Sequence, residues 1–306
     1  MLATAIFAGT ILQTSANAAN LVVNGDFEIS TTKPAYADTN GIGHIDKLVD
    51  LSAWTKSCLL NCGGVITSAN SHGYAFVVND QAATRPNGGG FGAIYNNTVR
   101  EQLYFWGPAN TISYSNNGFT GSSNGGKFIA IDGDFGRSKL SQVVSGLDTT
   151  KTYTLSFEYA GAQQGLDANN YTGATSQKWI VGGISGSAIE VGPWVNPSKG
   201  FTPWQSYSTT FQPSATSIDL SFTAWGNVIG GGEPSGIDSM PPFLLLDNVQ
   251  ILENPPTPPP TPPNPPTPPT PPTPPTASTP SPMPLLGAGL AFTTARRLRQ
   301  RLKISI

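Results

Sequence analysis

The sequence predicts an all-β sandwich, and three observations support this fold class. Of the 306 residues, 34 are Gly, 28 are Pro and only 11% are charged, a composition that disfavours long helices. Short runs rich in Val, Ile, Thr and aromatic residues alternate with clusters of Gly, Asn, Ser and Pro, which is typical of a sandwich or barrel. Most prolines lie between residues 255 and 284, so the folding part has a length at which one all-β domain is common.

The clearest expected strand covers residues 151–161. Gly146 and Asp148 precede it, where a hairpin turn needs residues of their type. Alternation predicts further strands at 126–133, 138–147, 177–183, 205–213, 218–226 and 242–252. The long polar stretches 87–102 and 226–242 are predicted to be loops, where binding residues concentrate.

The N-terminus is predicted to be a signal peptide over residues 1–18. An apolar stretch from Leu2 to Leu12 is followed by a polar region that ends in Ala16, Asn17 and Ala18, a small-x-small pattern that signal peptidase accepts. The usual positive segment before the apolar stretch is missing, which leaves a buried terminal strand or helix as the alternative. With cleavage after Ala18, we expect an exported β-sandwich domain over residues 19–254.

The two cysteines, Cys58 and Cys62, lie four residues apart in a turn-rich segment. In an exported protein this spacing favours a small disulfide loop. A zinc site is disfavoured, because two thiolates without a nearby His or a second Cys pair are too few ligands.

The charge distribution excludes one class of partner. The formal net charge is −2, and removing the five positive charges of the final segment leaves −7. An acidic body lacks the clustered Lys and Arg that nucleic-acid binding requires, so we exclude nucleic acid as a partner.

The segment 255–282 repeats Pro-Pro-Thr. Proline fixes the backbone φ angle and donates no hydrogen bond, so we expect a polyproline II stalk that extends about 3.1 Å per residue, roughly 85 Å in all. Its Thr residues are candidates for O-linked sugars. A ligand for a proline-recognition domain is the alternative.

The C-terminal segment 283–306 has an apolar run that is too short for an ordinary membrane span, followed by a basic cluster. With the residues just before it, this ending resembles the PEP-CTERM sorting tag of bacterial exported proteins, in its cyanobacterial form. The motif residues are Pro282, Met283 and Pro284, with Met283 in the place of the usual Glu, and Arg296 and Arg297 open the basic cluster.

This resemblance implies a tail that holds the protein at the membrane only transiently. The arginines would stay at the cytoplasmic face during export, until an exosortase-like enzyme cuts near the proline motif. A permanent C-terminal anchor is the alternative.

The body carries a second resemblance. The segment NLVVNGDFE (20–28), then Trp54, GGKFIAIDGD (125–134) and PPFLLLDNVQI (241–251) are similar in order to the landmarks of galactose-binding-like jelly-roll domains of the carbohydrate-binding-module type. The resemblance implies a structural Ca²⁺ that ties the first strand to the last, with Glu28, Asp26 and Asp247 as ligands. The alternative is that Asp26 makes a turn hydrogen bond and Asp247 caps a loop.

Sugar binding in such folds relies on aromatic faces. Tyr104, Phe105 and Trp106 are consecutive, so no strand can bury all three on one face. We therefore predict Trp106 as the platform, and core packing is expected for the tryptophans in alternating or landmark positions, Trp54, Trp179 and Trp204. The predicted ligand-binding residues are Trp106, Tyr104, Trp194 and Trp225.

Nothing in the sequence supplies a catalytic framework. His44 and His72 lie in loop-like stretches outside any catalytic signature, and we expect both to be solvated. The segment 132–136 resembles half a calcium loop and is expected to form a turn. We therefore expect a protein without enzyme activity, exported to the cell surface or extracellular matrix and associated with glycan or exopolysaccharide. A structural or adhesive surface protein and a glycoside or polysaccharide hydrolase are the alternatives.

Overall fold

The computed structural model describes residues 18–33, 42–46, 49–59, 73–80, 105–108, 114–134, 136–165, 172–184, 186–228 and 242–255. The chain divides into two units, Met1–Pro256 and Thr257–Ile306, and every described element lies in the first. The predicted signal peptide up to residue 17, most of the stalk, and the sorting tail with Pro282, Met283, Pro284, Arg296 and Arg297 lie outside the described residues. Within the described ranges, no helix is long and apolar enough to cross a membrane.

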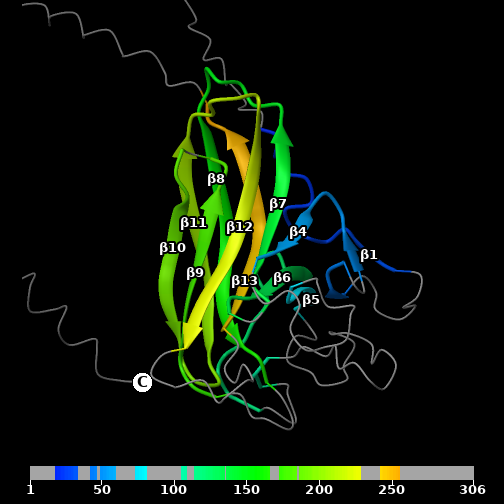
Figure 1. The fold of residues 1–306 in the computed structure, drawn as a ribbon, viewed down its shortest axis with the longest axis vertical. Coiled ribbons are helices and arrows are strands. Elements are labelled where there is room, and N and C mark those ends of the chain that lie inside the picture. The colour runs from blue at the N-terminus through cyan, green and yellow to red at the C-terminus, as the bar shows by residue number, and fades with distance from the viewer. Residues whose placement is uncertain are drawn as a thin grey trace, which may run out of the picture. The chain divides into compact units, whose positions relative to one another are not determined.

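The described part of the chain is an all-β jelly-roll sandwich, as predicted, with thirteen strands and no helix. One sheet has the strand order β10-β9-β12-β7-β4, and these strands follow one another from left to right in Figure 1. Its strands are β10 (Ile189–Asn196), β9 (Thr175–Gly182), β12 (Ser217–Val228), β7 (Ser138–Ser145) and β4 (Thr55–Cys58).

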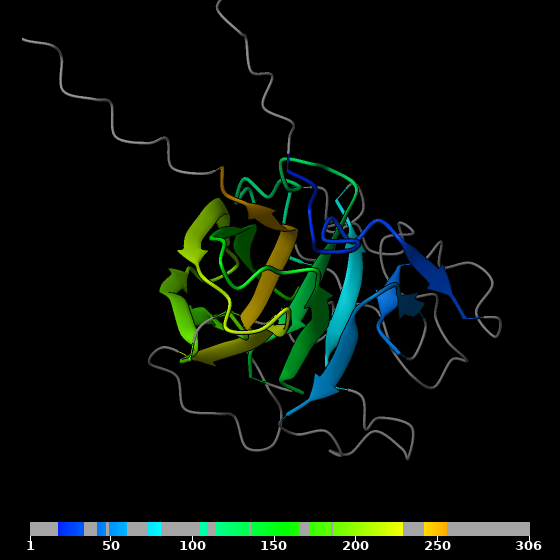
Figure 2. The same ribbon diagram turned by 90° about the horizontal axis from the view of Figure 1, so that it is seen from above.

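The second sheet has the order β11-β8-β13-β6-β5-β2, and all its named pairings are antiparallel. Its strands are β11 (Phe201–Phe211), β8 (Tyr153–Gln163), β13 (Pro242–Glu253), β6 (Lys127–Asp132), β5 (Ala75–Asn79) and β2 (Gly43–His44). A small sheet of β1 (Ser30–Thr32) and β3 (Val49–Leu51) lies to one side of the sandwich in Figures 1 and 2.

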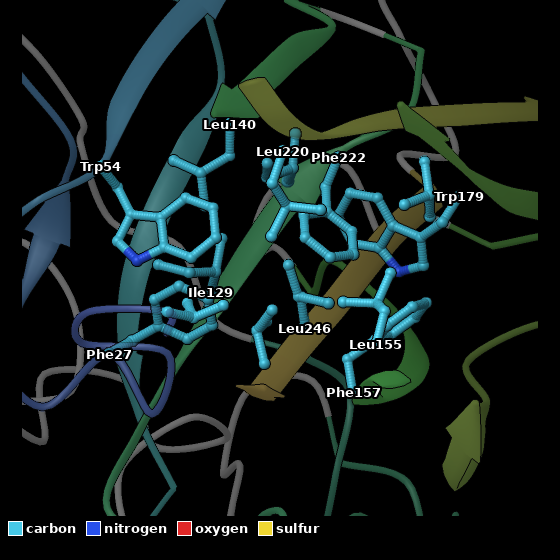
Figure 3. Packing of buried hydrophobic residues seen from close by; sticks show 14 of the residues in the cluster. Phe27, Trp54, Ile129, Leu140, Leu155, Phe157, Trp179, Leu220, Phe222 and Leu246 are labelled. Carbon is cyan, nitrogen blue, oxygen red and sulfur yellow. The ribbon is translucent and has the colours of Figure 1, made fainter. Parts of the chain in front are cut away.

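The main core fills the space between the two large sheets (Figure 3). Trp179 packs edge-on against Phe222 with ring centroids 6.1 Å apart, and Phe222 packs edge-on against Phe157 at 5.0 Å. At the other end of the core, Trp54 contacts Phe27 at 5.4 Å and donates its indole N–H to the Asn24 carbonyl at 3.0 Å. Each such side chain stabilises the fold by about 1.5–3 kcal/mol through removal from water.

A second apolar cluster covers the outer face of the six-stranded sheet. Phe128, Phe243 and Ala160 point away from the main core and meet Phe105 and Phe119, which lie outside the named strands. The outward side chains of β7, β9 and β12 on the opposite sheet are only half-buried or exposed. The two outer faces of the sandwich therefore differ, and the face of the five-stranded sheet is the more polar one.

The hairpin before β8 forms as expected. Gly146 adopts a φ of 86°, and the carboxylate of Asp148 accepts a hydrogen bond from the Thr150 amide at 2.9 Å. These bonds from Thr150 hold the pKa of Asp148 below its usual value. Polar turn chemistry between two alternating strands was therefore a sufficient signal for this element.

Two local expectations were wrong. His44 lies in β2, is only 6% exposed, and packs edge-on against Phe76 with ring centroids 5.1 Å apart, so it is a core residue. The stretch 226–242 was expected to be loop throughout, but β12 runs to Val228 and β13 begins at Pro242. The two-residue strand at His44 is too short to produce a recognisable alternation. His72 lies outside the described residues.

Candidate functional site

Trp106, the predicted platform, is enclosed. Its side chain is only 3% exposed, and the Lys199 ammonium lies 4.6 Å from its ring centroid. Phe105 beside it is fully buried in the second cluster, and both residues lie outside the named strands. This placement does not support a sugar platform at Trp106, and Tyr104 lies outside the described residues.

Trp194 lies at the edge of the sandwich between β10 and β8. A bulge between Val191 and Trp194 turns its ring inward, where it lies 5.0 Å from the Tyr159 ring. The Nε1 atom of Trp194 and the Oε1 atom of Gln177 are both buried without a hydrogen-bond partner. Trp194 therefore belongs to the packing of the sandwich edge.

The three tryptophans that were predicted to be core residues are all held by contacts with other residues. Trp54 and Trp179 are buried in the main core. Trp204 is half-buried against Phe128, and its Nε1 donates to the Thr120 carbonyl at 3.0 Å.

Trp225 differs from these residues, because it stands on the outer face of the five-stranded sheet. On β12, Leu220, Phe222 and Ala224 enter the core, so Thr223 and Trp225 point outward. The ring is half-buried, and no hydrogen bond ties its indole nitrogen to a described residue. Trp225 is thus a half-buried tryptophan of the outer face whose indole nitrogen is not held by a described residue.

Charged side chains surround Trp225. Lys178 is its partner on β9, and the Lys178 ammonium lies 4.8 Å from the ring centroid. The Arg137 guanidinium, beside the start of β7, lies 5.9 Å from the same centroid. Glu190 on β10 accepts a hydrogen bond from Lys178 at 2.7 Å.

Lys139 on β7 is paired with Thr223, two residues before Trp225 on the same face. We call the set Trp225, Lys178, Arg137, Lys139 and Glu190 the Trp225 face. It combines an aromatic ring with hydrogen-bonding groups, which is what recognition of a sugar ring requires.

A buried carboxyl group with acidic neighbours lies on the other sheet. Asp247 on β13 is fully buried, is paired with Glu158 on β8, and accepts hydrogen bonds from the Ser122 hydroxyl and from the Asn248 amide. Burial raises the pKa of Asp247 to about 8, and the nearby charges of Glu158 and Glu28 add to this effect. The hydrogen bond from Ser122 joins Asp247 to the loop before β6.

Glu28 and Asp26 take different positions. Glu28 accepts a hydrogen bond from the Lys127 amide at 2.6 Å, at the end of the same loop. Asp26 lines a polar hollow of about 370 Å³ together with Asn124 and Asn248. The hard oxygen donors suit Ca²⁺ chemically. Within the described residues, however, no three His, Cys, Asp or Glu side chains are grouped as a metal ion would need, so the Ca²⁺ site stays a prediction.

Cys58 ends β4 and is disulfide-bonded. Cys62, the other member of the predicted pair, lies outside the described residues.

The charged residues of the Trp225 face were missed by sequence reasoning. Lys178 and Trp225 are 47 positions apart in the chain and meet only through the β9–β12 pairing. The alternation of β9 and β12 was visible, and it implied that Lys178 and Trp225 point outward. Their proximity could not be predicted, because no local sequence pattern determines the order of strands in a sheet.

Comparison with known proteins gives neither a family nor a ligand. No family model matches the chain, and no curated protein matches it. Forty-two chains of solved structures match. The structure of TmCBM61 in complex with β-1,4-galactotriose is 12% identical over 77% of this chain and 99% of its own, with a TM-score of 0.36.

Two further structures have similar values. The K1 cleaved adhesin domain of Lys-gingipain from Porphyromonas gingivalis W83 is 11% identical over 74% of this chain and 98% of its own, with a TM-score of 0.34. The CBM22-1 xylan-binding domain of Xyn10C from Paenibacillus barcinonensis is 14% identical over 50% of this chain and 80% of its own, with a TM-score of 0.22. Likenesses this low give no basis for choosing a ligand.

Proposed function

We propose that the β-sandwich is a glycan-binding module and that the Trp225 face is its binding surface. The observation that carries the proposal is the outward indole of Trp225, which lies among hydrogen-bonding side chains on the polar outer face of the five-stranded sheet. A half-buried tryptophan on a strand offers an apolar ring to the C–H side of a pyranose, and neighbouring polar groups orient the sugar hydroxyls.

The rigidity of this surface supports the proposal. Trp225 and Lys178 lie on hydrogen-bonded central strands of the sheet, and Phe222 and Trp179 anchor the same two strands in the core beneath them. A site on paired strands keeps its side chains in place before the ligand arrives, so binding costs little ordering entropy.

Affinity electrophoresis through gels that contain one polysaccharide each tests the proposal. We expect at least one polysaccharide to retard the native protein, and Trp225→Ala to restore its mobility. Val143→Ala is the matched control, because Val143 is 69% exposed and faces outward from β7 on the same sheet, beside Asp219. Free mobility of the native protein in every gel, or equal retardation of Trp225→Ala, would contradict the proposal.

The hydrogen bonds of the described carboxylates favour a binding module without catalysis. Asp247 and Glu158 are neighbouring carboxyl groups in different environments, and acid–base catalysis can use such a pair. Yet Asp247 is fully buried and bonded to Ser122, and Glu158 accepts hydrogen bonds from Ser123, so the loop that carries both serines occupies these carboxylates. We therefore propose that the pair fixes this loop and that the protein is not a hydrolase.

We further propose that the module is displayed at the cell surface or in the extracellular matrix, associated with exopolysaccharide. The predicted signal peptide, the Pro-Pro-Thr repeat and the resemblance of the C-terminal segment to a PEP-CTERM tag support this location, with an exosortase-like enzyme as the proposed processing partner. Intact mass spectrometry of the protein from its native cells tests it. We expect a mass that lacks residues 1–18 and the C-terminal basic cluster, and a full-length mass would contradict the proposal.

A further inference from the structure

We propose that the Trp225 face selects anionic glycans, whose sugar rings carry carboxylate or sulfate groups. This inference rests on the glycan-binding function proposed above and adds the substrate class. Its basis is the position of two cationic side chains beside one outward indole ring and of a third, Lys139, on the same face.

Positive charge is concentrated on the Trp225 face. Of the 16 Lys and Arg, five belong to the C-terminal basic cluster, and of the remaining eleven, three belong to the Trp225 face: Lys178 and Arg137 beside the ring, and Lys139 opposite Thr223. The chain before the C-terminal basic cluster contains all 18 Asp and Glu. The body as a whole is acidic and would repel a polyanion. A polyanion can therefore be attracted only where cations are grouped, as they are on this surface.

The cations of the Trp225 face are only partly neutralised by carboxylates. Lys178 has one carboxylate partner, Glu190, whose side chain is 56% exposed. The charge of Arg137 lowers the pKa of Asp134, although burial raises that pKa by more. Lys139 makes no ion pair with a described residue. Three cations face two carboxylates, so one positive charge stays available to a ligand.

Cationic side chains reach the Trp225 ring from both sides of β12. The strands β9 and β7 flank β12 on its two sides, so Lys178 and Arg137 approach the Trp225 ring from opposite neighbours. A neutral sugar that stacks on this ring displaces the Lys178 ammonium from the aromatic face and offers no charge in return. A sugar with an oxyanion offers the ammonium a new partner, and the guanidinium can bind the same type of group in a bidentate manner.

The test compares polymers that differ only in charge. Dextran sulfate is paired with dextran, and polygalacturonate with its carboxyl-reduced form, so that sulfate and carboxylate are tested separately. At low salt we expect the native protein to bind at least one charged polymer about tenfold more tightly than its neutral counterpart, and this advantage to shrink at about 0.5 M NaCl because exposed charges are screened.

Two variants connect the preference to the site. Lys178→Gln is expected to weaken binding of the charged polymer about fivefold and not to weaken binding of neutral polymers, which no longer have to displace the ammonium from the ring. Glu190→Gln removes the partner of Lys178 and is expected to strengthen binding of the charged polymer about threefold. Lys151→Gln is the matched control, because Lys151 makes a comparable surface ion pair with Glu253, 2.8 Å long, on the other sheet of the sandwich.

Different outcomes would contradict the anionic selectivity and the proposed glycan binding. Binding of neutral and charged polymers with equal affinity, lost in Trp225→Ala, would overturn the anionic selectivity and leave the glycan-binding function standing. Absence of binding to every polysaccharide would overturn both. A preference for charge that Lys178→Gln and Glu190→Gln do not alter, or tighter binding of single-stranded DNA than of either charged polysaccharide, would also overturn the inference.

Discussion

Asp247 on the last strand accepts a hydrogen bond from the hydroxyl of Ser122, a residue 125 positions earlier in the chain. The bond joins a fully buried carboxyl to the loop that leads into β6. Because Glu158 and Glu28 lie near the same carboxyl, the protonation of Asp247 affects how firmly this loop is held. Two predictions follow from this arrangement.

The first prediction concerns stability against pH in the presence of a chelator. The folded protein holds the Asp247 proton up to a pKa of about 8, whereas the ordinary value is 3.8. Between these two values the folded state binds more protons than the unfolded state, so the contribution of Asp247 to the unfolding free energy falls as pH rises from about 4 to about 8, and is constant above.

Urea unfolding of the native protein and of Asp247→Asn across this range measures the contribution. The neutral amide cannot titrate, so we expect the difference in stability to shift in favour of the variant by several kcal/mol between pH 4 and pH 8. Asp219→Asn, on the exposed face of β12, is the control. A difference that stays constant with pH would show that Asp247 titrates normally.

The second prediction concerns Ca²⁺. If Glu28 and Asp247 hold a structural calcium ion, millimolar CaCl₂ at pH 7.5 raises the Tm by several degrees relative to EDTA, because the ion binds only the folded state. Glu28→Gln and Asp247→Asn are each expected to remove this increase, and MgCl₂ is expected to give less. A Tm that is the same in CaCl₂ and EDTA would contradict a structural calcium ion.

The third prediction concerns the edge of the sandwich. A Cβ atom at Gly161 would lie 2.3 Å from Gln177 Oε1 and 2.5 Å from Trp194 Nε1, too close for either atom to stay in place. Gly161→Ala is therefore expected to destabilise the fold by about 1–3 kcal/mol in urea unfolding. Gly186→Ala is the matched control, because nothing lies within 4 Å of its Cβ position. Equal stability of the two variants would contradict the described packing.

The fourth prediction separates the tryptophans of one sheet. Trp179 is fully buried, and Trp179→Ala is expected to cost about 3–5 kcal/mol of unfolding free energy. Trp225→Ala, on the opposite face of the same sheet, is expected to cost less than about 1 kcal/mol. Chemical denaturation measures both. A large loss of stability in Trp225→Ala would assign Trp225 to packing, against a role in binding.

The fold was largely predictable from the sequence, because long strands with strict alternation carry their own signal. The strands β6 to β9 and β11 to β13 all overlap the expected ranges. β10 was missed, since the bulge at Gly192 and Pro193 interrupts its alternation. The short strands β1 to β5 span at most five residues each, too few for a periodic pattern.

The candidate site was predictable only in part. Trp225 was among the expected ligand-binding residues, but Lys178, Arg137 and Glu190 were not, because their proximity depends on strand order. Trp106 was expected to face outward, and the second apolar cluster encloses this segment instead. A cluster on the outer face of a sheet cannot be read from one strand, since it forms between segments that are distant in the chain.

The affinity of Trp225→Ala for a retained polysaccharide, measured against Val143→Ala, tests the central claim most directly. If Trp225 is the stacking platform, Trp225→Ala binds at least about tenfold more weakly, a loss of about 1.4 kcal/mol, while its unfolding free energy and the affinity of Val143→Ala stay near those of the native protein. Equal affinities for all three proteins would contradict glycan binding at the Trp225 face.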